Sequence, residues 1–106
     1  MVAMNDIQEL ANRIAREFHP QRIILFGSHA FGSPKPDSDV DLMVVAPYRG
    51  KSWEMATRIR GRVEPTFPLD LLVRSPEQVN ERVALGDPFL TEVVQCGKVL
   101  YEADHE

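Results

Sequence analysis

The chain of 106 residues contains a single cysteine, Cys96. It therefore cannot form a disulfide within itself or a CxxC metal site, and we expect Cys96 to be a packing residue on a helix. No apolar run approaches the roughly 20 residues that a membrane-spanning helix needs. The first residues lack the basic start and apolar stretch of a signal peptide, so the expected location is cytoplasmic, with no membrane partner.

The chain also lacks an excess of basic residues. It has 12 Lys and Arg against 16 Asp and Glu, a formal net charge of −4. This balance argues against nucleic-acid binding through a broad basic surface. It does not exclude a single nucleotide, whose charge a metal ion can neutralise. The length predicts one domain, over residues 1–106, with one hydrophobic core.

Hydrophobic patterning predicts helices alternating with strands. Asp6 is the expected N-cap of the first helix, with Glu9 completing a capping box, and Pro20 ends that helix. Its apolar stripe is Ile7, Leu10, Ala11, Ile14, Ala15 and Phe18. Further helices are expected over residues 52–64, 76–85 and 88–96, with a short one over 28–31. In the helix over 52–64 the residues expected to face inward are Trp53, Ala56, Ile59 and Val63, and Ser75 with Gln78 forms a capping box at the start of the helix over 76–85. Strands are expected over residues 22–26, 39–45, 69–73 and 98–101. This order predicts an α/β or α+β domain in which helices pack on a small mixed β-sheet.

Asp39 and Asp41 open the second predicted strand. Because residues two apart in a strand point to the same face, their carboxylates are expected to be neighbours. Two carboxylates at this spacing repel each other unless a cation lies between them. Oxygen ligands of this kind suit Mg²⁺ or Mn²⁺, the divalent cations that accompany nucleotide phosphates.

Asp70 is a third acid, and it stands within an apolar strand. Alternation places it on the face opposite Leu69 and Leu71. If this strand pairs beside the strand that holds Asp39 and Asp41, three carboxylates converge, and such a set can hold two metal ions about 3.5–4 Å apart. The alternative is that Asp70 is an edge-strand residue that faces water.

Gly27 and Ser28 break the first predicted strand. Glycine allows the backbone to approach a phosphate without a clash at Cβ. If Ser28 opens a short helix, the free N–H groups and the positive helix end face the ligand, and its hydroxyl adds a donor. The alternative is that Ser28 is a turn residue that contacts no ligand.

These features resemble the nucleotidyltransferase superfamily built on the DNA polymerase β-like palm, and more closely the minimal nucleotidyltransferases (MNT) of bacteria and archaea. The signature of that family is Gly-Ser, ten residues, then Asp-x-Asp. In this chain its parts are Gly27-Ser28, residues 29–38 and Asp39-Val40-Asp41. The third acid of the family maps onto Asp70.

The resemblance implies transfer of a nucleoside monophosphate, with ATP the expected donor, to a hydroxyl, with release of pyrophosphate. Asp39, Asp41 and Asp70 would be the catalytic, metal-binding residues, and Gly27 and Ser28 would hold the phosphates. It also implies a HEPN-type toxin partner, which the chain would neutralise as an antitoxin by placing AMP on a tyrosine. Because a palm of this length leaves little room for an acceptor domain, we expect another chain to complete the acceptor site.

Two alternative functions stay open. One is a non-catalytic antitoxin that neutralises its partner by contact, and the other is a small-molecule nucleotidyltransferase, such as one acting on an aminoglycoside. The family often carries arginine within the Gly-Ser turn, where this chain has His29 and Phe31. His29 is either a phosphate contact or a packing residue. Three basic residues elsewhere could reach a triphosphate or an acidic partner: Arg49, Lys51 and Arg74.

Overall fold

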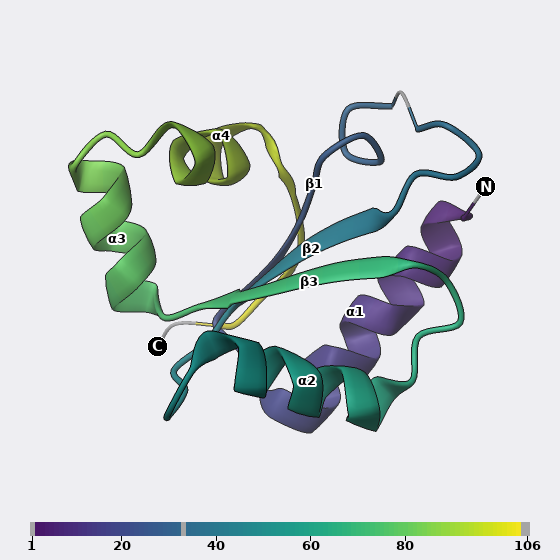
Figure 1. The fold of residues 1–106 in the computed structure, drawn as a ribbon, viewed down its shortest axis with the longest axis horizontal. Coiled ribbons are helices and arrows are strands. Elements are labelled where there is room, and N and C mark those ends of the chain that lie inside the picture. The colour runs from purple at the N-terminus through teal and green to yellow at the C-terminus, as the bar shows by residue number, and fades with distance from the viewer. Residues whose placement is uncertain (1, 33, 105–106) are drawn as a thin grey trace.

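The computed structural model describes residues 2–32 and 34–104, and over these residues the chain forms four helices and four strands (Figure 1). In chain order they are α1 (Met4–Phe18), β1 (Arg22–Phe26), β2 (Val40–Val45), α2 (Ser52–Val63), β3 (Leu69–Arg74), α3 (Pro76–Ala84), α4 (Pro88–Cys96) and β4 (Lys98–Glu102). The predicted strands are all present, with bounds that differ by one residue at most. The mixed α/β architecture is confirmed.

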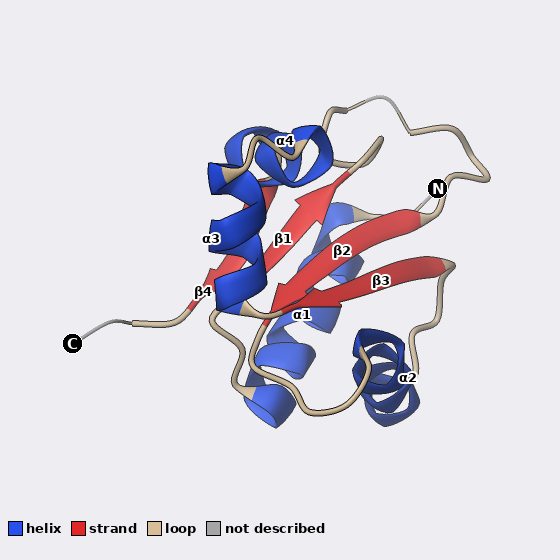
Figure 2. Ribbon diagram, turned by 60° about the vertical axis from the view of Figure 1, so that its left-hand side comes forward, coloured by secondary structure: helices blue, strands red, loops and turns tan. Residues whose placement is uncertain are grey.

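The four strands form one sheet with the order β3-β2-β1-β4. β2 and β3 run parallel, whereas β1 pairs antiparallel with both β2 and β4. α1 and α2 pack on one face of the sheet, and α3 and α4 pack on the other (Figure 2). The sheet is therefore the middle of three layers, and β1 and β2 are its inner strands.

Residues of β2 alternate between the two cores. Leu42 and Val44 pack with α1 and α2, while Met43 and Val45 pack with α3 and α4. All four are fully buried. A strand that is covered on both faces is expected to have a continuous run of apolar residues. β2 has such a run after Asp41. None of the described helices is long and apolar enough to cross a membrane.

The start of α1 differs from the prediction. The N-cap is Ala3 rather than Asp6, because the amide groups of Asp6 and Ile7 already donate to the Ala3 carbonyl. Asp6 instead lies in the first turn, where its charge favours the positive end of the helix. The predicted apolar stripe is confirmed, and its buried members are Ile7, Leu10, Ala11, Ile14 and Ala15.

Three further expectations were wrong. Cys96 was expected to be a packing residue, but it is exposed at the end of α4, whose buried residues are Leu90 and Val93. Residues 28–31 form hydrogen-bonded turns rather than a helix, with the amides of Ala30 and Phe31 both donating to the Gly27 carbonyl. Trp53 was expected to face inward, but it is 63% exposed. The buried residues of α2 are Met55, Ile59 and Val63, and Trp53 precedes Met55 by two positions, about 200° around a helix of 3.6 residues per turn.

The capping box of α3 is present as predicted. The amide of Gln78 donates to the Ser75 hydroxyl at 3.1 Å, and the Gln78 side chain accepts from the Ser75 amide at 2.9 Å. Asp87 caps α4 in a similar way, by accepting from the Leu90 amide at 3.1 Å. These two caps define where the helices over the second face begin.

Replacing Ser75 with alanine should lower the free energy of unfolding by about 1 kcal/mol, since the helix loses its side-chain cap. Chemical denaturation of Ser75→Ala beside the unaltered protein measures the loss. Ser75→Thr, which retains the hydroxyl, is the matched control. Equal stability of the alanine variant and the unaltered protein would show that this cap does not hold α3 in place.

Candidate active site

The predicted acids come together at one end of the sheet, where β1 ends and β2 and β3 begin. Asp41 and Asp70 are direct partners in the parallel register of β2 and β3. On its other side Asp41 is paired with Phe26, the last residue of β1. Asp39 precedes β2 by one residue and is exposed. The strands that carry Asp41 and Asp70 are therefore neighbours, as convergence of the acids requires. β3 is also an edge strand in which Asp70 is exposed, so the alternative that Asp70 faces water also agrees with the structure.

The carboxylates belong to the face that α3 and α4 cover only in part. Asp41 is two residues before Met43, and Asp70 is two residues before Leu72, so they share the face of those apolar residues. Asp41 is half-buried and Asp70 is exposed. The helices lie over the rest of this face, and the acids stand where that cover ends.

Gly27 brings the Gly-Ser turn directly against Asp41. Its φ is +74°, a conformation that residues with a side chain rarely adopt. A Cβ at this position would collide with Asp41 Oδ2 and lie 3.1 Å from Asp41 Cγ. The absence of a side chain is therefore what allows the turn to pack on the carboxylate. Ser28, the next residue of the turn, is half-buried.

The pKa of Asp41 is raised above its ordinary value. Burial is the main cause, followed by the negative charges of Asp70 and Asp39, while His29 acts in the opposite direction. The three acids therefore influence one another electrostatically. A divalent cation would relieve this repulsion, and carboxylate oxygens are the ligands that Mg²⁺ and Mn²⁺ prefer. The donor set thus fits such a cation chemically.

The acids are near one another without being closed around one point. Over residues 2–32 and 34–104, no group of three or more His, Cys, Asp or Glu side chains is arranged so that it could hold a metal ion. Asp39 and Asp70 are both exposed, and exposed side chains change rotamer in picoseconds to nanoseconds. Binding of a cation by all three would require these two side chains to turn toward Asp41.

His29 is half-buried within the Gly-Ser turn. Both of its ring nitrogens are shielded from solvent and have no hydrogen-bond partner among the described residues. Because a bound ligand could supply the missing partner, these nitrogens do not separate the packing alternative from a phosphate contact.

The basic residues considered from sequence lie elsewhere. Arg74 ends β3, four residues or about 13 Å from Asp70 along a strand, and it donates to the Val73 carbonyl. Arg49 and Lys51 follow β2, at the same far end of the sheet. Arg60 of α2 is closer, because its guanidinium donates to the carbonyl of Leu69, next to Asp70, at 2.8 Å.

An apolar pocket adjoins the carboxylates, and sequence reasoning missed it. It has a volume of about 260 Å³ and is lined by Phe26, Gly27, Phe31, Phe89, Glu92 and Val93. These residues come from the end of β1, the turn after it and α4. No local pattern links them, although an aromatic residue inside the Gly-Ser turn was a departure that could have drawn attention to it.

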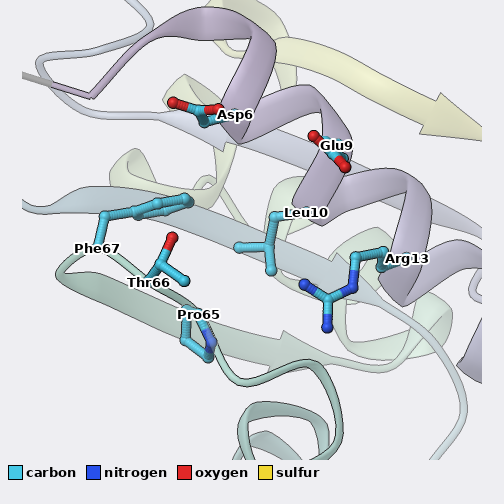
Figure 3. A pocket seen from close by; sticks show the side chains of 7 residues that line it. All are labelled: Asp6, Glu9, Leu10, Arg13, Pro65, Thr66 and Phe67. Carbon is cyan, nitrogen blue, oxygen red and sulfur yellow. The ribbon is translucent and has the colours of Figure 1, made fainter.

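A separate hollow of about 210 Å³ lies on the opposite side of the sheet, between α1 and the connection that enters β3 (Figure 3). Asp6, Leu10 and Arg13 border it from the helix, and Phe67 borders it from the connection. None of the predicted site residues lines this hollow. The acids and the Gly-Ser turn therefore remain the candidate site.

The family model for "Polymerase beta, Nucleotidyltransferase" matches residues 8–106. The chain belongs to this nucleotidyltransferase family. Its fold is that of the polymerase β-like nucleotidyltransferases. Comparison with curated proteins gives no significant match.

Three solved structures share the fold at low sequence identity. One is a toxin–antitoxin with AMP-PNP, with a TM-score of 0.57 and 22% identity over 92% of this chain and 74% of that chain. A candidate nucleotidyltransferase from Sulfolobus solfataricus has a TM-score of 0.59 and 18% identity over 92% and 78%. A double Asp-to-Glu mutant of the toxin–antitoxin MntA-HpeT has a TM-score of 0.54 and 21% identity over 97% and 76%.

Gly27→Ala should damage both folding and the site, because it combines a strained φ with a collision at Asp41. Gly86→Ala is the matched control, since Gly86 has a φ of +84° with nothing within 4 Å of the added Cβ. We expect Gly27→Ala to lower the free energy of unfolding by more than Gly86→Ala does. Equal losses in urea denaturation would show that strain alone matters and that the turn does not pack on the carboxylate.

Asp41→Asn should raise the free energy of unfolding at neutral pH. A carboxyl whose pKa is raised in the folded state holds its proton more tightly there, so folding stability falls as pH rises through that pKa. The neutral amide avoids this loss, and its advantage should shrink as pH is lowered below the raised pKa. Denaturation curves at several pH values measure this, with exposed Asp37→Asn as control; an advantage independent of pH would contradict the expectation.

Proposed function

We propose that this chain is a metal-dependent nucleotidyltransferase that moves AMP from ATP to a hydroxyl. The observation that carries the proposal is the packing of the Gly-Ser turn on Asp41, which itself pairs with Asp70. A small-residue turn beside carboxylates of adjacent strands gives a place for phosphates next to a place for cations. The family match supports the reaction class, and the AMP-PNP of one structural neighbour supports an adenine nucleotide.

Asp39, Asp41 and Asp70 are the residues that would hold Mg²⁺ or Mn²⁺. When bound, the cation would neutralise phosphate charge and stabilise the departing pyrophosphate. Gly27 and Ser28 would hold the β- and γ-phosphates at the turn, with the Ser28 hydroxyl as a donor to phosphate oxygens. Catalysis would rest on positioning and on charge neutralisation.

The chemical step is a displacement at the α-phosphorus. The acceptor oxygen forms a bond to that phosphorus, the bond between the α-phosphorus and the bridging oxygen breaks, and pyrophosphate leaves. The proton of the acceptor hydroxyl passes to Asp70, which is exposed and can be reached from solvent.

We propose that the acceptor is a tyrosine of a HEPN-type toxin and that the chain acts as its antitoxin. Two structural neighbours are toxin–antitoxin proteins, and one of them carries changes at two aspartates two positions apart. That spacing is also the spacing of Asp39 and Asp41. The sequence signature of the minimal nucleotidyltransferases supports the same assignment.

Changing Asp39 and Asp41 together to asparagine should abolish transfer of label from α-labelled ATP to the toxin in the presence of Mg²⁺. The amides keep the size of the side chains and remove the charges that hold the cation. Asp37→Asn is the matched control, because this exposed aspartate lies two residues before Asp39 and outside the site. It should label the toxin as the unaltered protein does.

Undiminished labelling by the double variant would contradict the proposed mechanism. Protection of cells by a double variant that no longer labels the toxin would favour neutralisation by contact. Labelling of an aminoglycoside in place of the toxin would favour a small-molecule enzyme with the same catalytic acids.

A further inference from the structure

We infer that the apolar pocket beside Gly27 binds the nucleobase of the donor nucleotide, with Phe31 as the residue on which the base stacks. This inference rests on the proposed function and names the part of the substrate that the proposed mechanism leaves unassigned. The pocket is lined by Phe26, Gly27, Phe31, Phe89, Glu92 and Val93.

The pocket is continuous with the carboxylate site through Gly27 and Phe26. Gly27 lines the pocket and also packs on the Asp41 carboxylate. Phe26 lines the pocket and is the direct strand partner of Asp41. Adjacent strands are about 4.8 Å apart. A nucleotide whose α-phosphate lies beside Asp41 therefore has to place its base one or two strand spacings away to enter the pocket. The ribose between the phosphate and the base covers that distance.

The lining of the pocket suits a flat, neutral aromatic group. The rings of Phe26 and Phe89 meet edge-to-face, with centroids 5.6 Å apart. Phe31 is 50% exposed and Phe89 is 45% exposed, so both retain aromatic surface for a ligand. Stacking of a nucleobase on such a ring is favourable for every base, because each has a π face.

The charge of the pocket disfavours the triphosphate end of the nucleotide. None of its described lining residues is basic, and the one ionisable residue, Glu92, is acidic and exposed. A triphosphate would be repelled by Glu92, whereas the amino group of a base could donate to it. The phosphates are thus directed to the turn and the base to the pocket.

The order of the strands separates the pocket from the expected acceptor position. The sheet runs β3-β2-β1, so Asp70 lies on one side of Asp41 and the pocket lies on the other. Under the proposed mechanism the acceptor hydroxyl approaches Asp70. The pocket is then on the donor side, which is why a nucleobase is favoured over an aromatic side chain of the partner.

The test compares binding of ATP with binding of inorganic tripolyphosphate, both with Mg²⁺, by calorimetry. Phe31→Ala should weaken ATP binding by about 5- to 150-fold, the range expected for one lost base–aromatic stack, and leave tripolyphosphate binding unchanged. Phe31→Trp should retain ATP binding, since it keeps an aromatic face. Trp53→Ala, which removes an exposed aromatic residue of α2, should change neither ligand.

Three results would overturn the inference. The first is unchanged ATP binding by Phe31→Ala, with Phe89→Ala also unchanged and both variants folded by circular dichroism. The second is equal weakening of ATP and tripolyphosphate, which would assign Phe31 to the phosphate turn. The third is a higher KM for the acceptor with unaltered ATP binding, which would assign the pocket to the partner.

Failure of the proposed function gives a different pattern. If the Asp39 and Asp41 double variant still labels the toxin while Phe31→Ala selectively weakens ATP binding, the catalytic mechanism is wrong and the base pocket stands. If the unaltered protein binds neither ATP nor tripolyphosphate with Mg²⁺, both proposals are overturned.

Discussion

The burial of Asp41 beside two further carboxylates is the constraint on which the candidate site depends. Asp41 is half-buried between Asp70 on one neighbouring strand and the Gly27 turn on the other, and its pKa is raised by that burial and by Asp70 and Asp39. This arrangement destabilises the protein without a ligand and favours any divalent cation that neutralises it. The same arrangement requires glycine at position 27, because any side chain there would displace the Asp41 carboxylate.

The unequal covering of the two sheet faces explains why the site is where it is. α1 and α2 bury one face along β2 and β3, as far as Val40 and Leu69 at the strand starts. On the other face α3 and α4 pack over Met43 and Val45. The helices do not cover the first residues of β2 and β3 on this face, which are Asp41 and Asp70. The caps at Ser75 and Asp87 determine where those two helices begin, and Phe89, in the first turn of α4, lines the aromatic pocket at the border of the open part of the sheet.

Sequence reasoning succeeded where the signal was local. Strand bounds, the stripe of α1 and the Ser75 cap follow from periodicity and capping chemistry over a few residues. It was wrong at two positions in helices: Ala3 caps α1 in place of Asp6, and Met55 takes the inward position expected for Trp53. Hydrophobicity alone placed the larger residue inside, but the phase of α2 against the sheet is decided by Ile59 and Val63.

By itself the sequence determined the Gly-Ser turn, the spacing of Asp39 and Asp41, and the setting of Asp70 in a strand, because all three depend on residues close along the chain. The tertiary structure decided that β3 lies parallel to β2, which makes Asp70 the partner of Asp41 and leaves Arg74 at the far end of the sheet. It also decided that Phe89 of α4 meets Phe26 of β1. These are contacts between residues distant in sequence, and they follow from burial of both sheet faces, which no local pattern encodes.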